Sequence, residues 1–210
     1  RNNSMETHTS LVSKLLIVAS IAYPIFVFSI FPNWVIDDAI IGYRYSENLA
    51  MYGSFTWNLG EPPVEGYTGV LLPVAVAGGI TLGADPFVVS RWIGIISFFL
   101  AWVLLFLTFR LLHIRDMAIA LILLLYGTTS VLFTHATSGM ETMLFITAIF
   151  FSLYSFARFL SDGGRGKSAL LSLALLLTSL VRPEGVAFSG LVFLAALYFQ
   201  YKHRRNELGR

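Results

Sequence analysis

The sequence contains no cysteine, so disulfides and thiolate chemistry are excluded, and the redox compartment cannot be inferred. Charge is also scarce: 12% of the residues are charged, whereas 56% are hydrophobic and the mean hydropathy is +0.74. An ordinary soluble domain carries about 25% charged residues. The composition therefore predicts a polytopic membrane protein, and a net charge of only +2 gives no indication of a nucleic-acid partner.

Six apolar segments are candidates to cross a bilayer, given a rise of about 1.5 Å per helical residue. They cover residues 11–32, 87–112, 117–134, 142–160, 169–182 and 186–201. The first segment could instead be a cleaved signal peptide, although its apolar run is long for one. We predict an all-α membrane protein in which residues 1–210 form a single transmembrane domain.

Residues 33–86 form a large loop that follows the first span, and two helices are expected within it. The first, over residues 38–52, carries an apolar stripe of Ile41, Tyr45, Leu49 and Tyr52, ends at Gly53 and should lie on the membrane surface. The second, over residues 69–84, is apolar but short and is interrupted by Pro73 and Gly78-Gly79. We expect this second helix to lie at the interface without crossing the bilayer.

The distribution of charge predicts the topology, because cytoplasmic loops are enriched in Lys and Arg. If residues 69–84 do not cross, both termini are cytoplasmic and share their side with Lys14, Arg110, Arg115, Arg158, Arg165, Lys167, Lys202, Arg204, Arg205 and Arg210. The opposite, outer side then holds eight acids: Asp37, Asp38, Glu47, Glu61, Glu65, Asp85, Glu141 and Glu184. If residues 69–84 do cross, the basic loops after the second span lie outside instead.

Ionisable side chains next to membrane spans are costly, which makes them candidates for a functional site. The candidates are Asp37, Asp38 and Glu65 in the first outer loop, Glu141 before the fourth span, and Arg182 with Glu184 between the fifth and sixth spans. Each has a structural alternative: the two aspartates or Glu141 could cap the helices that follow, and the last pair could be an interfacial anchor.

Four motifs occur in order along the chain: Asp37-Asp38-Ala39 with Arg44-Tyr45, then Glu65-Gly66-Tyr67-Thr68, then Ser138-Gly139-Met140-Glu141-Thr142, then Arg182-Pro183-Glu184-Gly185. This order resembles the N-terminal half of GT-C membrane glycosyltransferases, and in particular bacterial arabinofuranosyl- and mannosyltransferase-like members. The resemblance implies a GT-C-like bundle with juxtamembrane helices in its first outer loop. It also implies an inverting enzyme of the bacterial inner membrane that moves a sugar from a polyprenyl-phosphate donor to an extracytoplasmic acceptor.

The resemblance further implies an acidic general base in the first outer loop, for which we choose Asp37, with Asp38 as helix cap or supporting partner. Substrate would be bound by Arg44, Tyr43, Glu65, Tyr67, Glu141, Arg182 and Glu184, with Trp57 as another ring that could face a sugar and Arg91 as another cation for the leaving phosphate. Some GT-C enzymes hold a divalent metal on paired carboxylates. Because side chains adjacent in sequence diverge, a metal on Asp37 and Asp38 is left open but not favoured.

An alternative from another functional class stays open at this stage. The chain could be a non-catalytic membrane subunit, built on a truncated GT-C-like scaffold, that packs against a larger membrane complex. A transporter is disfavoured, because the acids gather in outer loops rather than near the middle of the bilayer. In either reading the partners are the bilayer itself and, for the enzyme, a polyprenyl-phosphate-linked sugar whose tail would lie beside residues 69–84.

Overall fold

The computed structural model describes residues 2–31, 34–62, 64, 66–162 and 164–208, with the backbone alone described at 2–10, 162 and 203–208. Within this part of the chain the regular structure is entirely helical, as the sequence predicts. The helices are α1 (Asn2–Ile30), α2 (Asp37–Tyr52), α3 (Leu71–Thr81), α4 (Pro86–Leu111), α5 (Asp116–Thr128), α6 (Ser130–Thr137), α7 (Thr142–Asp162), α8 (Arg165–Val181) and α9 (Glu184–Leu208).

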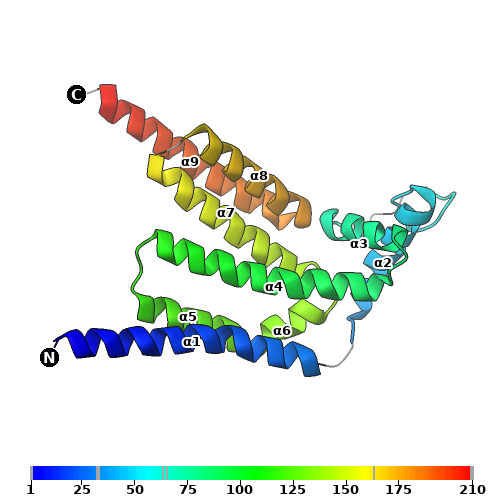
Figure 1. Cartoon of the computed structure of the whole chain (residues 1–210). Helices are drawn as coiled ribbons and strands as arrows, with labels where there is room; N and C mark the ends of the chain where they lie inside the picture. The colour runs from blue at the N-terminus through cyan, green and yellow to red at the C-terminus, as the bar shows by residue number, and fades with distance from the viewer. Residues whose placement is uncertain (1, 32–33, 63, 65, 163, 209–210) are drawn as a thin grey trace.

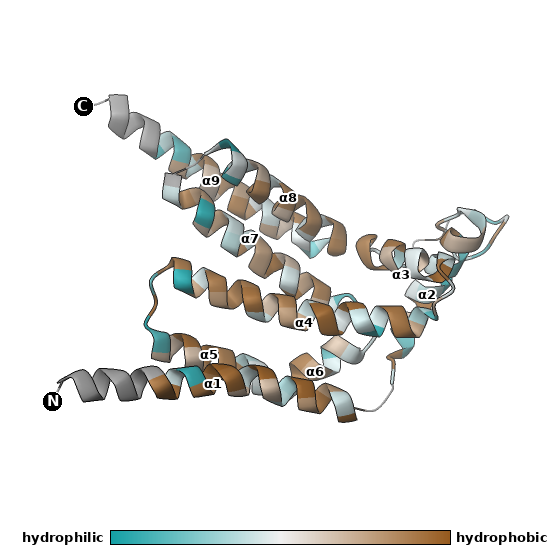
Figure 2. Ribbon diagram, viewed as in Figure 1, coloured by the Kyte–Doolittle hydropathy of each residue, from teal (hydrophilic) through white to brown (hydrophobic). Residues whose placement is uncertain are grey.

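Four of these helices are long and apolar enough to cross a membrane. The qualifying segments are Leu11–Ile30, Pro86–Leu111, Thr142–Ser161 and Glu184–Lys202, and the ribbon in Figure 2 is coloured by the hydropathy of each residue. These four helices indicate an integral membrane protein. Helix α8 has 17 residues, so it is about 26 Å long and somewhat shorter than the roughly 30 Å hydrocarbon core. A count of six spans stays a prediction.

The segment predicted as one span over residues 117–134 is divided into α5 and α6, whose axes differ by 54°, so it forms either a broken span or a re-entrant pair and its crossing stays a prediction. At the break the Thr129 hydroxyl donates to the Leu125 carbonyl at 2.6 Å, a local bond that competes with the helical ladder and bends helices. Two residues earlier, a Cβ at Gly127 would collide with the carbonyl oxygen of Ser20. Helix α5 therefore lies directly on the backbone of α1, and α6 turns away from that direction.

The bundle has two distinct ends (Figure 1). The beginning of α1 and the end of α9 lie at one end, which we call the terminal end, together with the α4–α5 and α7–α8 connections. Helices α2 and α3 lie at the opposite end, the loop end, together with the beginnings of α4, α7 and α9. The predicted outer segments are therefore gathered at one end of the molecule. Its larger core joins α4, α5, α6 and α7 through Phe98, Ala101, Trp102, Ile119, Leu123, Phe133 and Met143.

The predicted apolar stripe of α2 is not one continuous exposed face. Tyr52 is 64% exposed, whereas Tyr45 is buried, and the remaining buried face consists largely of small or polar side chains: Ala39, Gly42, Tyr43, Ser46 and Asn48. Small residues allow another chain segment to approach closely, so α2 packs on protein, mainly on α3 through Leu72 and Val76. The predicted end of this helix is correct, since Gly53 follows it with φ of 67°.

Helix α3 has only 11 residues, which corresponds to about 16 Å and is too short to cross a bilayer. It is fastened to the bundle at its start, where the Val70 amide donates to the Leu180 carbonyl at 3.1 Å. A Cβ at the preceding Gly69 would collide with the carbonyl oxygen of Val181. This close backbone contact joins the large outer loop to the end of α8.

We expect cysteines introduced at Glu61 and Ser161 to react with a membrane-impermeant thiol reagent from opposite sides of the membrane. Glu61 is exposed at the loop end and Ser161 is exposed where α7 ends, and the chain has no cysteine of its own to interfere. Labelling is measured in sealed vesicles before and after permeabilisation. Ser138 is unsuitable as an outer probe because its side chain is 3% exposed. Equal labelling of both sites from one side would contradict the two-ended arrangement.

Candidate functional site

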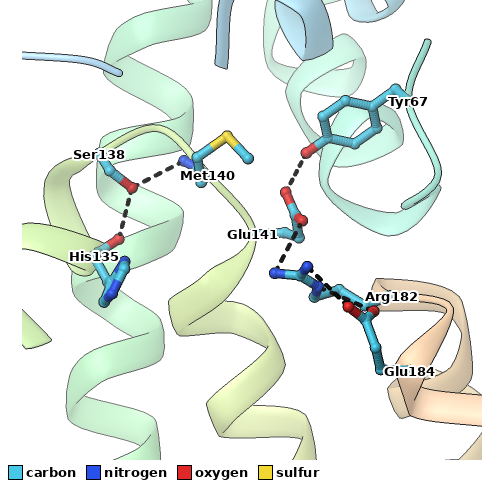
Figure 3. Close-up of polar contacts among 7 residues, drawn as sticks. All are labelled: Tyr67, His135, Ser138, Met140, Glu141, Arg182 and Glu184. Atoms are coloured by element: carbon cyan, nitrogen blue, oxygen red, sulfur yellow. Dashed lines mark hydrogen bonds and ion pairs between the residues drawn. The ribbon is translucent and has the colours of Figure 1, made fainter. Parts of the chain in front are cut away.

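The centre of the candidate site is Glu141, whose carboxylate lies at the start of α7 and is only 6% exposed as a residue. The Tyr67 hydroxyl donates a short hydrogen bond to its Oε2 atom. The guanidinium of Arg182 lies 3.6 Å from its Oε1 atom. Figure 3 shows the carboxylate between these two partners. A buried carboxylate is costly unless it is paired and hydrogen-bonded, so this contact fixes three distant chain segments in one place.

Arg182 lies in the break between α8 and α9, where its backbone is extended with φ of −150° and ψ of 150°. The following Pro183 disfavours a helical conformation at Arg182 and so helps to end α8 there. The guanidinium also forms a two-pronged contact with Glu184, with N–O distances of 3.1 and 3.3 Å. It lies 5.9 Å from the ring centre of Phe145. Because the Arg182 side chain is 32% exposed, part of its cationic group is accessible from outside the protein.

Tyr67 is placed by close contacts on both sides. Its ring lies against Gly42 of α2, where a Cβ would approach the ring to 3.0 Å. Just before it, the Tyr45 hydroxyl donates to the Val64 carbonyl at 2.5 Å and accepts from the Gly66 amide at 2.9 Å. Burial raises the pKa of Tyr67, and the negative charge of Glu141 raises it further. The phenol therefore stays protonated at neutral pH and acts as a donor to that carboxylate.

The loop before Glu141 is held by α2. The Ile36 amide donates to the Ser138 carbonyl at 3.1 Å, and Gly139 takes a positive φ of 81°. A Cβ at Gly139 would collide with the hydroxyl of Tyr43, which is buried and lies 2.7 Å from the Ser90 hydroxyl. Tyr43 thus belongs to the packed contact between α2, α4 and this loop.

Asp37 and Asp38 are both exposed and lie in the first turn of α2. The prediction that Asp38 caps this helix is wrong, because α2 begins one residue earlier than expected and the N-cap position falls on Ile36. It is Asp37 whose Oδ1 accepts a hydrogen bond from the Asp38 amide, at 3.1 Å. Since Ile36 is bonded to Ser138, this turn lies against the loop that leads to Glu141.

Two other predicted residues are placed away from Glu141. Arg44 is exposed, and its Nε donates to the Trp57 carbonyl at 3.3 Å, so it points to the irregular part of the outer loop. Arg91 donates to the Phe31 carbonyl at 3.1 Å, at the end of α1. Glu65 lies outside the described residues.

A divalent metal would need several His, Cys, Asp or Glu side chains close together among the described residues. Among them, no three His, Cys, Asp or Glu side chains are grouped closely enough to hold an ion. The side chains in this part of the chain therefore do not fit a divalent metal.

Two contacts of the loop end were not predicted from the sequence. Asp85 caps α4 by accepting from the amides of Phe87 and Val88, at 2.9 and 3.2 Å. The signal was present, because Asp followed by Pro is typical of a helix start. The Ser90 hydroxyl that meets Tyr43 had no such signal, because only the packing of α2 on α4 brings the two together.

An apolar groove of about 290 Å³ opens beside the candidate site, between α3, α4, α7 and α8. Its wall includes Leu71, Leu100, Leu104, Leu144, Phe151 and Val181. Leu144 lies about one helical turn after Glu141, and Val181 directly precedes Arg182. The arrangement therefore combines a partly accessible cation with an adjacent apolar groove, which suits a molecule with an anionic head and a hydrocarbon tail.

Replacing Tyr67 by phenylalanine is expected to lower the free energy of unfolding by about 1–3 kcal/mol, because the buried Glu141 carboxylate loses a donor. The measurement is reversible unfolding of the purified protein in mixed micelles, followed by circular dichroism. The same change in a Glu141→Leu background should have a much smaller effect, since the acceptor is already absent. An equal loss in both backgrounds would show that the two residues are not coupled.

Comparisons with protein-family models, with curated proteins and with solved structures find no match for this chain. The residues that converge at the loop end and the groove beside them are therefore the features that indicate a function.

Proposed function

We propose that the chain is a membrane glycosyltransferase that moves a sugar from a polyprenyl-phosphate donor to an extracytoplasmic acceptor, with inversion at the anomeric carbon. The observation that carries the proposal is the position of Arg182, paired with the buried Glu141 and lying at the end of an apolar groove of about 290 Å³. Three of the four motifs that resemble GT-C enzymes supply Tyr67, Glu141 and Arg182, and Glu141 is in contact with each of the other two residues. We further propose that the loop end faces outward and that both termini are cytoplasmic, in the bacterial inner membrane.

The proposed donor would place its phosphate near Arg182 and its isoprenoid tail in the groove. A phosphate can compete with Glu184 for the guanidinium, because Glu184 is 62% exposed and its pairing with Arg182 is open to solvent. Glu141 and Tyr67 would keep Arg182 in position while this exchange occurs. Arginine suits this role because its planar group binds phosphate oxygens in pairs.

The reaction would then require a base for the acceptor. In the proposed step a carboxylate, Asp37, takes the proton of an acceptor hydroxyl as that oxygen attacks the anomeric carbon. The bond from the anomeric carbon to the phosphate oxygen breaks, and polyprenyl phosphate leaves with the added negative charge. The guanidinium of Arg182 would stabilise this charge as it develops. Glu141 is less suitable as the base because its two oxygens are already engaged by Tyr67 and Arg182.

The experiment that tests the proposal uses the protein as purified in lipid nanodiscs. Polyprenyl phosphates carrying radiolabelled mannose, arabinose, glucose or galactose are offered with an oligosaccharide acceptor, and labelled product is measured. Native mass spectrometry then compares retention of decaprenyl phosphate with retention of neutral decaprenol. We expect sugar transfer from one of the donors. We also expect the protein to retain decaprenyl phosphate in preference to decaprenol, and Arg182→Gln to reduce this preference. Equal retention of the two lipids would refute the role of Arg182, and phosphate binding without transfer would favour the non-catalytic subunit.

A further inference from the structure

A second groove lies far from Glu141, at the terminal end of the bundle. It has a volume of about 90 Å³ and is formed between α8 and α9 where α8 begins and α9 approaches its end. Its base is apolar, with Leu171, Leu175 and Ala196 buried in the contact between the two helices. Its lining also contains three polar side chains: Ser168 and Ser172 of α8 and Gln200 of α9.

The polar side chains occupy a surface that would face lipid. Ser168 and Ser172 are one helical turn apart, and Ser172 and Gln200 are exposed. At about 1.5 Å per residue, Ser168 lies roughly 5 Å and Ser172 roughly 10 Å along α8 from its first residue. This depth corresponds to the headgroup and glycerol region of a leaflet if α8 begins at the interface. The Ser168 hydroxyl donates to the Gly164 carbonyl at 3.3 Å, whereas the exposed side chains of Ser172 and Gln200 can donate to ester and phosphate oxygens of a lipid.

A positive charge lies at the same end of the groove. Arg165 and Lys167 lie in the first turn of α8. Lys202 lies two residues after Gln200, so it projects from the opposite face of α9 and does not border the groove. Arg165 is one turn before Ser168, so the two share a helix face. The Lys167 ammonium donates to the Ser161 hydroxyl at 2.6 Å at the end of α7. Basic side chains beside a pocket between membrane helices are complementary to anionic lipid headgroups.

We propose that this groove binds one anionic phospholipid from the leaflet at the terminal end. Its phosphate would lie by Arg165, its glycerol and ester oxygens by Ser172 and Gln200, and part of one acyl chain on the apolar base. This site lies at the opposite end of the bundle from the proposed transfer site. It does not depend on the proposed function, and its test uses no activity measurement.

The test measures lipid retained by the full chain on release from nanodiscs that contain equal amounts of dioleoyl phosphatidylglycerol and dioleoyl phosphatidylcholine. Native mass spectrometry should show one phosphatidylglycerol held in preference to phosphatidylcholine. The Arg165→Gln variant should bind the anionic lipid roughly fivefold more weakly, which is the usual contribution of one basic residue near an anionic surface. Ser172→Leu should reduce retention too, because it fills the groove and removes a donor without changing charge.

The matched control is Arg115→Gln, which also removes one positive charge from the same end of the bundle but from the residue just before α5. This variant should retain phosphatidylglycerol as the unmodified protein does, and all variants should show the same helical circular dichroism. Equal retention of the two lipids would overturn the proposal. So would equal losses in the two arginine variants, or normal retention by Ser172→Leu, because either would show a diffuse surface attraction and no specific groove.

Discussion

Replacing Asp37 by asparagine is expected to lower the rate of sugar transfer by about 10²–10⁴-fold, the typical contribution of a general base. The change should leave folding nearly intact, because the asparagine carbonyl can still accept the Asp38 amide that Asp37 accepts at 3.1 Å. Lipid binding should also be unaffected, since Asp37 lies on α2 and the apolar groove lies between α3, α4, α7 and α8. Transfer is measured in nanodiscs with the donor identified by the binding and transfer panel.

Asp38→Asn is the matched control, because both aspartates are exposed in the same helical turn. Its side chain does not cap α2, so we expect a loss of at most about 1 kcal/mol from the interaction with the helix dipole and near-normal transfer. Full transfer by Asp37→Asn with a large loss in Asp38→Asn would move the base to the second aspartate. Normal transfer by both variants would remove the base from this turn.

Gly94→Ala is expected to destabilise the protein by about 3 kcal/mol, at the upper end of the usual cost of overpacking. A Cβ at Gly94 of α4 would collide with the backbone carbonyl oxygen of Ala136 in α6. Because backbone cannot rotate out of the way as a side chain can, α6 must move as a unit. That movement would also displace the loop that carries Glu141. The free energy of unfolding and the donor-binding affinity should therefore fall together.

The control for this change is Gly190→Ala. Gly190 also lies within a membrane-length helix, α9, but nothing surrounds the position of its Cβ within 4 Å. The substitution there should be neutral or should stabilise the protein by up to about 1 kcal/mol, since alanine favours helix over glycine. Similar losses at the two glycines would show that the α4–α6 contact is not tight.

The sequence predicts well the features that depend on a short, continuous stretch of residues. The apolar segment 87–112 corresponds to α4 and the segment 142–160 to α7 within two residues at each end, because length and composition alone decide whether a helix suits a bilayer. Gly53 ends α2 as expected, since glycine adopts the positive φ that a helix end requires. Such signals need no knowledge of the partners that a segment will meet.

The features that the sequence did not predict depend on contacts between distant segments. Tyr67, Glu141 and Arg182 could be assigned to one side of the membrane, but nothing local showed that a single carboxylate would bind both partners. The buried face of α2 was misjudged because Gly42 counts as neither apolar nor polar in a helical stripe. Because Gly42 has no side chain, the Tyr67 ring can approach the helix. This contact can be recognised only in the packed structure of the loop.

The break at Thr129 bears on how the chain is assembled during synthesis. Helices α5 and α6 have 13 and 8 residues, and neither is long enough to enter a bilayer by itself. Together they form one apolar stretch, so the insertion machinery would receive them as a single straight segment. The bend would form afterwards, when Gly127 meets the backbone of α1 at Ser20. This contact can form only after Gly127 has been made, 97 residues beyond the end of α1 at Ile30.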